Sequence, residues 1–205
     1  PLTKVDIDNL AKKIAGRNYK INEASIKDDF CNYRYEVTEG IGLGDKHGVT
    51  GAGIIKDELR EALGVLHVHL AVMDEIFKHS GIEVEDIDTL HTHELTSLYR
   101  VTSFKIKDTK GAAHVTIKGT KYASSAGGWF DITSPSVAMD NLSSYKWYKE
   151  LKKAVDDICE EVAKYREGNY IPVKNEEETD KDQGSLFDGK TTEAAIDDEF
   201  EKAEV

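Results

Sequence analysis

Cationic and aromatic side chains recur at two-residue spacing along residues 97–107 and 113–122, a pattern that indicates half-buried strands. The second segment collects its polar side chains on one face, at His114, Thr116, Lys118, Thr120 and Tyr122. Its apolar side chains share the opposite, core-facing side, at Ala113, Val115 and Ile117. The first segment has one side with Tyr99, Val101, Ser103, Lys105 and Lys107, and Arg100 falls on the other side.

The stretch from Ser97 to Ser125 is basic within an acidic chain. Its only acid is Asp108, against Arg100, Lys105, Lys107, Lys110, Lys118 and Lys121, a balance of +5. Cations can follow phosphates while aromatic rings stack on unpaired bases, at roughly 1–3 kcal/mol per base. Ring candidates for stacking are Tyr99, Tyr122, Trp129 and Phe130.

The sequence therefore predicts a surface for single-stranded nucleic acid, composed of Tyr99, Arg100, Lys105, Lys107, Lys118, Lys121, Tyr122 and Trp129. An alternative stays open, because lysines that only keep a solvent-facing sheet soluble and protect its edges would give the same pattern. The choice between DNA and RNA is open as well.

Other residues with chemical potential give weaker patterns. His91 and His93 would share one face of a strand and could begin a metal site, but no third ligand follows at a recurring spacing. The glycine-rich residues 40–53 precede a helix, as phosphate-binding loops do, but lack the P-loop spacing. No nucleophile triad or carboxylate pair stands out. We predict no catalytic residue, no metal and no cofactor, and hence no enzyme.

The predicted strands and helices form a sheet that would position these cationic and aromatic side chains. Aromatic and β-branched character predicts a strand at 30–37, and a meander of strands at 90–96, 97–107, 113–122 and 128–134. Helical spacing predicts helices at 3–16, 54–81 and 143–168. The helix at 54–81 is apolar around most of its circumference, so it is central to a core or lies between subunits, which makes a homodimer one option.

The expected fold is therefore α+β, with one domain over residues 1–168. Its mostly antiparallel sheet has about five strands, as a small barrel or a helix-backed sheet, with a long central helix and a C-terminal helix. Residues 169–205 form an acidic tail that we expect to be disordered, because its hydrophobicity is low and its charge is high.

Composition places most of the charge in that tail. The chain has 205 residues and a net charge of −12, of which residues 170–205 carry −8 with 12 acids and 4 lysines. No apolar run is long enough to cross a membrane. The two cysteines, Cys31 and Cys159, lie far apart without zinc-site spacing. We expect a cytoplasmic protein, in the bacterial host cytoplasm if a phage encodes it.

Two apolar spots interrupt the tail, at 183–187 and 194–200. Gln183, Ser185, Leu186 and Phe187 resemble the short peptide by which bacterial and phage replication and repair proteins bind the sliding clamp. The acidic segment around Ile196 and Phe200 resembles the C-terminal tails of single-stranded-DNA-binding proteins of bacteria and their phages. These resemblances imply partner-binding residues in the tail, at Gln183, Leu186, Phe187, Ile196 and Phe200.

Two functional hypotheses follow. The first is a single-stranded DNA-binding accessory protein of phage or mobile-element replication or recombination, whose tail recruits the sliding clamp or other replication proteins. The second is a non-enzymatic interaction or assembly protein, such as a virion component or an inhibitor of a host factor, that does not bind nucleic acid.

Overall fold

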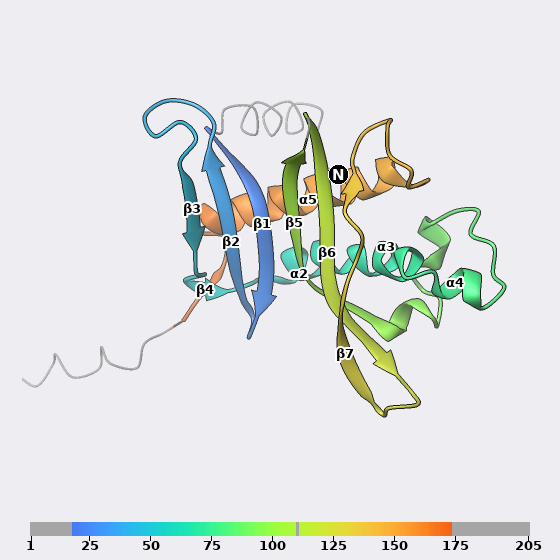
Figure 1. Cartoon of the computed structure of the whole chain (residues 1–205). Helices are drawn as coiled ribbons and strands as arrows, with labels where there is room; N and C mark the ends of the chain where they lie inside the picture. The colour runs from blue at the N-terminus through green and yellow to red at the C-terminus, as the bar shows by residue number, and fades with distance from the viewer. Residues whose placement is uncertain (1–17, 110, 174–205) are drawn as a thin grey trace, which may run out of the picture. The chain divides into compact units, whose positions relative to one another are not determined.

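The computed structural model describes residues 18–109 and 111–173 (Figure 1). The helix expected at 3–16 and most of the expected tail, residues 174–205, lie outside the described residues. The proposed tail contacts also lie outside them: Gln183, Leu186, Phe187, Ile196 and Phe200.

The described residues form an α+β fold built on one open, antiparallel sheet of nine strands. The strand order is β7-β6-β5-β1-β2-β4-β9, with β3 also beside β2 and β8 also beside β6. The strands are β1 (Tyr19–Lys27), β2 (Phe30–Val37), β3 (Lys46–Val49), β4 (Gly53–Ile54), β5 (Tyr99–Thr109), β6 (Ala112–Ala123), β7 (Gly128–Thr133), β8 (Val137–Ala138) and β9 (Ile171–Pro172).

Among the described residues, helices cover one face of this sheet and leave the other face open (Figure 1). They are α2 (Asp57–Gly64), α3 (Leu66–Met73), α4 (Ile76–His79) and α5 (Tyr148–Arg166), with short 3-10 turns η1 (Asp88–Leu90) and η2 (Thr96–Leu98). The prediction of a helix-backed sheet is confirmed, and the barrel and the count of about five strands are wrong. The expected C-terminal helix is present as α5.

The core lies between the sheet and the helices. Strand residues on the helix-facing side are buried, including Ile21, Phe104, Val115 and Ile117. α5 buries one stripe along its length, at Leu151, Val155, Ile158 and Val162. Leu66 and Leu70 of α3 are fully buried in the same core. The apolar side chains of α3 therefore need no second subunit to cover them.

The prediction of one continuous helix at 54–81 is wrong. The helical segment begins at Asp57 and is interrupted at Val65 and again at Asp74 and Glu75. Glu75 has a left-handed backbone with φ +58°, which an α-helix does not tolerate. Gly64, a weak helix former, lies at the first interruption.

The meander is partly as expected. Strands predicted at 97–107, 113–122 and 128–134 are confirmed as β5, β6 and β7. The strand predicted at 90–96 is wrong, because that segment is made of turns between η1 and η2. β1 was not predicted, because its alternation is broken by an extra residue at Asn22, between the pairs Ile21 with Tyr35 and Glu23 with Arg34.

The glycines of residues 40–53 have a structural role. Gly40, Gly42 and Gly44 all have φ between +82° and +85° in the β2–β3 loop, a region that other residues rarely adopt. A Cβ at Gly51 would lie 2.2 Å from the Tyr165 hydroxyl and 2.5 Å from the Cys31 carbonyl oxygen. These glycines therefore allow a tight loop and a close approach of the chain to β2 and α5.

Candidate nucleic-acid interface

An extra residue in β5, Thr102, decides which side chains reach the open face. β5 pairs with β6 so that Val101 faces Gly119 and Ser103 faces Lys118, which leaves Thr102 without a partner. Such a bulge reverses the alternation of side chains on either side of it. Residues 103–107 therefore lie on the sheet faces that the sequence predicted. The residues before the bulge lie on the faces opposite to those predicted.

Two predicted interface residues lie on the helix-facing side: Tyr99 because of this bulge, and Lys121 because it alternates with Lys118 along β6. Tyr99 is 3% exposed on the helix-facing side, and its hydroxyl donates to Asp74 Oδ2 at 2.5 Å. Lys121, which lies opposite Tyr99 in β6, donates to the same carboxylate oxygen at 2.5 Å. Burial and the neighbouring carboxylate raise the pKa of Tyr99, so it remains a neutral donor. The structure therefore places Tyr99 and Lys121 away from the open face, where both hold the end of α3 against the sheet.

The bulge brings Arg100 to the open face, where it joins the remaining predicted residues. Its guanidinium carbon lies 4.0 Å from the centroid of the Trp129 ring. Trp129 is 40% exposed and its ring centroid is 5.5 Å from that of Tyr122, its partner across β6 and β7. We call this set the open-face cluster; it consists of Arg100, Lys105, Lys107, Lys118, Tyr122 and Trp129.

The lysines of the open-face cluster differ in how far they are neutralised. Lys105 Nζ binds Glu23 Oε2 at 2.8 Å, and Arg34 approaches the same oxygen at 3.9 Å. Lys107 and Lys118 are exposed and form no ion pair with another described residue. Lys107 and Lys118 are therefore the cations most available to a phosphate.

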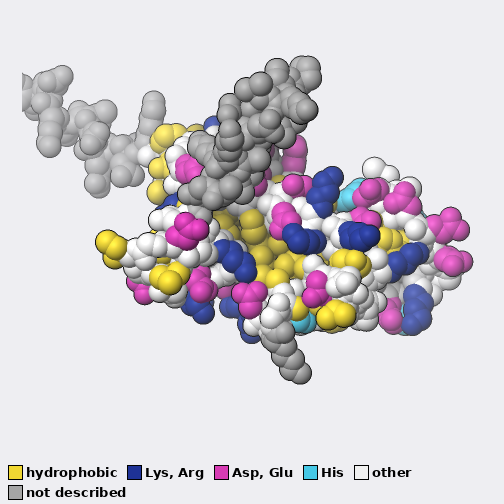
Figure 2. Space-filling model, turned by 90° about the horizontal axis from the view of Figure 1, so that it is seen from above, with side chains coloured by type: hydrophobic (Ala, Val, Ile, Leu, Met, Phe, Trp, Pro, Cys, Tyr) yellow, Lys and Arg dark blue, Asp and Glu magenta, His cyan; other side chains and the backbone are white. Residues whose placement is uncertain are grey.

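A groove adjoins the cluster where β1 and β5 separate. These strands pair only between Glu23–Ser25 and Ser103–Lys105, and beyond Glu23 they enclose a cavity of about 590 Å³. Its lining includes Arg34, Lys46, Lys105, Lys107, Glu23, Glu36, Asp108, Tyr35 and Ile106. In the view of the molecule from above, hydrophobic side chains are visible between Lys, Arg, Asp and Glu side chains (Figure 2).

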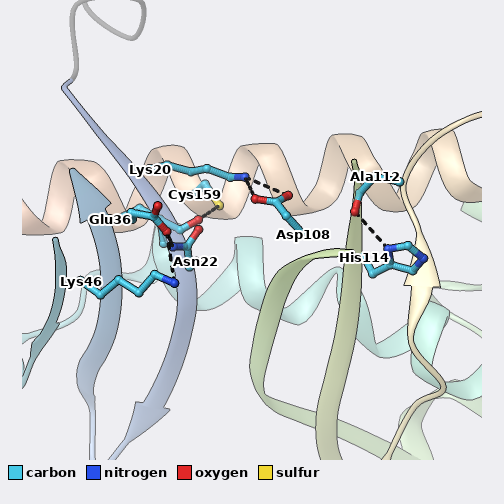
Figure 3. Close-up of polar contacts among 9 residues, drawn as sticks. Lys20, Asn22, Glu36, Lys46, Asp108, Ala112, His114 and Cys159 are labelled. Atoms are coloured by element: carbon cyan, nitrogen blue, oxygen red, sulfur yellow. Dashed lines mark hydrogen bonds and ion pairs between the residues drawn. The ribbon is translucent and has the colours of Figure 1, made fainter. Parts of the chain in front are cut away.

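Ion pairs link the two walls of the groove. Lys20 Nζ reaches from β1 to Asp108 Oδ2 of β5 at 3.2 Å (Figure 3). Within β1–β3, Glu36 Oε2 accepts from Asn22 at 3.3 Å and lies 3.8 Å from Lys46 Nζ. Four basic and three acidic side chains line the cavity, so its charge is nearly balanced.

Arg34, which lines the groove, was not among the residues predicted for the open face. Arg34 alternates with buried Cys31 and Tyr33 along β2, which would have placed it on the open side. Its contact with Glu23 could not be predicted, because it depends on the register of β1, a strand that was not predicted. No local signal linked residue 34 to Lys105.

His91 and His93 make separate contacts in the structure. His91 packs edge-on against His67, with ring centroids 5.6 Å apart. His93 packs against Phe77, and its Nδ1 accepts from the Leu95 amide at 3.1 Å. Across residues 18–109 and 111–173, no three His, Cys, Asp or Glu side chains are placed to hold a metal ion. The expectation that His91 and His93 share a strand face is wrong.

Both cysteines are free thiols, and burial raises the pKa of each to about 12. Within the part of the chain that the structure describes, no helix is long and apolar enough to span a membrane. Comparison of the chain with protein-family models, with curated proteins and with solved structures finds no match.

Proposed function

We propose that this protein is a single-stranded DNA-binding accessory protein of phage or mobile-element replication or recombination, which binds the strand on its open sheet face. The observation that carries the proposal is the open-face cluster, in which the exposed Lys107 and Lys118 lie along β5 and β6, and Arg100 covers the exposed Trp129 ring beside Tyr122 at the β6–β7 end. Leu186 and Phe187 in the tail would recruit the sliding clamp or other replication proteins.

The geometry suits an unpaired strand. Phosphates can follow the exposed lysines of β5 and β6, while bases stack on rings at the β6–β7 end. Arg100 already covers one face of Trp129, so a base would extend that stack and gain from the same cation. Because the chain has a net charge of −12, attraction must come from this local surface.

The test is fluorescence anisotropy of a labelled oligothymidine titrated with the full chain at two salt concentrations. We expect Lys107→Ala with Lys118→Ala to weaken binding by about tenfold and to lower the log-log salt slope by roughly 1.4, or 0.7 per lost phosphate contact. The matched control is Lys149→Ala with Lys153→Ala, which removes two exposed charges from α5. The control should bind as the unaltered chain does.

Two outcomes would reject the proposal. The first is no binding by either the full chain or a chain that ends at Val173. The second is equal loss of affinity in both double variants, because then no particular face would be responsible. The truncation keeps Ile171 and Pro172, which pair with Gly53 and Ile54 in the sheet.

One observation favours the assembly hypothesis as a second candidate. Ile41 and Leu43, in the β2–β3 loop, are 104% and 70% exposed. Exposed apolar side chains of this kind are common at protein interfaces. An assembly protein would bind a protein partner, and the double variant Ile41→Asp and Leu43→Asp would no longer bind it. Such a protein would not bind oligothymidine.

A further inference from the structure

One edge of the sheet has no strand beside it in the part of the chain that the structure describes. β7 pairs with β6 on one side and has no described strand on the other (Figure 1). Its six residues carry a single charge, Asp131, and expose two aromatic rings, Trp129 by 40% and Phe130 by 47%. An edge of this kind offers backbone N–H and C=O groups, with apolar side chains, to another strand.

The opposite edge carries the features that normally prevent strand addition. β9 has only two residues, of which one is Pro172, which cannot donate a backbone hydrogen bond. β3, the other outer strand there, has four residues and includes Lys46, His47 and Gly48. Short strands, proline and lysine all disfavour edge pairing. The two edges therefore differ in kind, and β7 is the one open to a partner.

We propose that β7 pairs antiparallel with β7 of a second copy of this chain, so that the two sheets become continuous in a two-fold symmetric dimer. The contact uses the strand edge; of the open-face cluster only Trp129 belongs to β7 and lies at the contact, and the other members stay uncovered. It does not depend on nucleic-acid binding.

The side chains of β7 select the register. Residues that pair across antiparallel strands lie on the same face, so a two-fold axis must place one residue opposite itself. An axis at Asp131 would set two carboxylates against each other, which is unfavourable. An axis at Phe130 pairs two exposed rings on the helix-facing side and sets Trp129 opposite Asp131 of the partner subunit on the open side. We assign the axis to Phe130.

A second copy is the occupant that this edge fits best. The contact is self-complementary, so every molecule in solution carries both halves of it. Two-fold pairing also closes after two copies and leaves no unprotected β7 edge for further addition. A foreign strand would gain the same backbone hydrogen bonds but not the pairing of Phe130 with itself.

Sedimentation velocity of the full chain over a concentration series tests the assignment. We expect a concentration-dependent dimer, and Phe130→Lys should raise its dissociation constant by about tenfold or more, because two like charges would then oppose each other. Ile41→Lys makes the same change at an exposed apolar residue in the β2–β3 loop and should leave the dimer intact. Circular dichroism checks that both variants fold.

A cross-link tests the register independently of stability. Side chains directly opposite in such a pair have Cβ atoms about 4.5–5.5 Å apart, close enough for a disulfide after small adjustments. Phe130→Cys should therefore give a covalent dimer under mild oxidation, and Ile41→Cys should not. A monomeric chain at every concentration would overturn the proposal. So would a dimer that both lysine variants leave unchanged, since another surface or partner strand would then be responsible.

Discussion

At the scale of single residues, His69 couples the stability of the protein to pH. Its side chain is 2% exposed inside α3, and its Nδ1 lies 2.9 Å from the Tyr145 hydroxyl. Burial, together with the smaller effects of the nearby His91 and His67, lowers the pKa of His69 to about 4. The folded protein therefore keeps His69 neutral where the unfolded chain, with an ordinary histidine pKa near 6.5, binds a proton.

We expect the free energy of unfolding to fall as the pH drops from about 6.5 to about 4, by up to about 1.4 kcal/mol per pH unit from His69. The sign follows because the unfolded state takes up the proton first. Urea denaturation at about pH 7 and about pH 5 measures the change. His69→Phe should reduce the pH dependence, while His79→Phe, at an exposed position with the same substitution, should keep it. Equal pH dependence in both variants would contradict this account.

The sheet face on which a side chain lies could be predicted from the sequence only where the two-residue alternation is unbroken. Lys105, Lys107, Lys118 and Tyr122 lie on the open face as the two-residue period requires. Tyr99 does not, because the bulge at Thr102 shifts the register by one residue. Lys121 was chosen for its charge, and its partner Asp74 lies 47 positions away, beyond the reach of a local pattern.

At the scale of elements, the β1–β2 hairpin carries local strain. Lys27 pairs with Phe30, so Asp28 and Asp29 form a two-residue turn, and their φ values are 50° and 66°. This is the conformation of a type I′ turn, which favours asparagine at the first position and glycine at the second. An aspartate at the second position is therefore strained.

Asp29→Gly should stabilise the protein by about 0.5–1 kcal/mol, because glycine adopts a positive φ without steric cost. The change also removes an exposed ion pair with Arg60 at 2.9 Å, which contributes little. Urea denaturation gives the free energy. Asp57→Gly, in the first turn of α2, should instead destabilise the protein. A loss of stability from Asp29→Gly would mean that the Arg60 contact outweighs the strain.

The elements that the sequence predicted well are those with an uninterrupted period. α5 has 19 residues with one buried stripe, and β5–β7 alternate over most of their length. The helices within residues 54–81 were harder to predict. A segment that is apolar on all sides has the same sequence pattern whether it forms one helix or several shorter helices in a core. The left-handed Glu75 has no sequence signature, since glycine or asparagine is the usual residue there.

At the scale of the whole molecule, the sheet has two parts that share one core. β1–β4 with β9, and β5–β8, meet only through the short β1–β5 pairing, while α2, α3 and α5 pack beneath. The groove lies along this junction, and Lys105 and Lys107 of the open-face cluster line it. Such a junction is set by packing between residues far apart in the chain, so the sequence alone did not reveal it.

The distribution of charge over the whole chain decides how the proposed interface would respond to salt. Residues 174–205 hold 12 acids and 4 lysines, so they account for −8 of the net charge of −12. Repulsion between these acids and a strand would act over about 10 Å at 0.1 M salt and farther at lower salt. The acids should therefore oppose binding most strongly at low ionic strength.

We expect a chain that ends at Val173 to bind oligothymidine more tightly than the full chain at about 0.02 M salt, with the difference shrinking towards about 0.2 M as screening increases. Anisotropy titrations at both concentrations measure this. A full-length control with the acids of residues 176–204 replaced by their amides should behave like the truncated chain, because charge and not chain length is responsible. If the control instead binds as the unaltered chain does, the electrostatic explanation is wrong, even if the open face binds the strand.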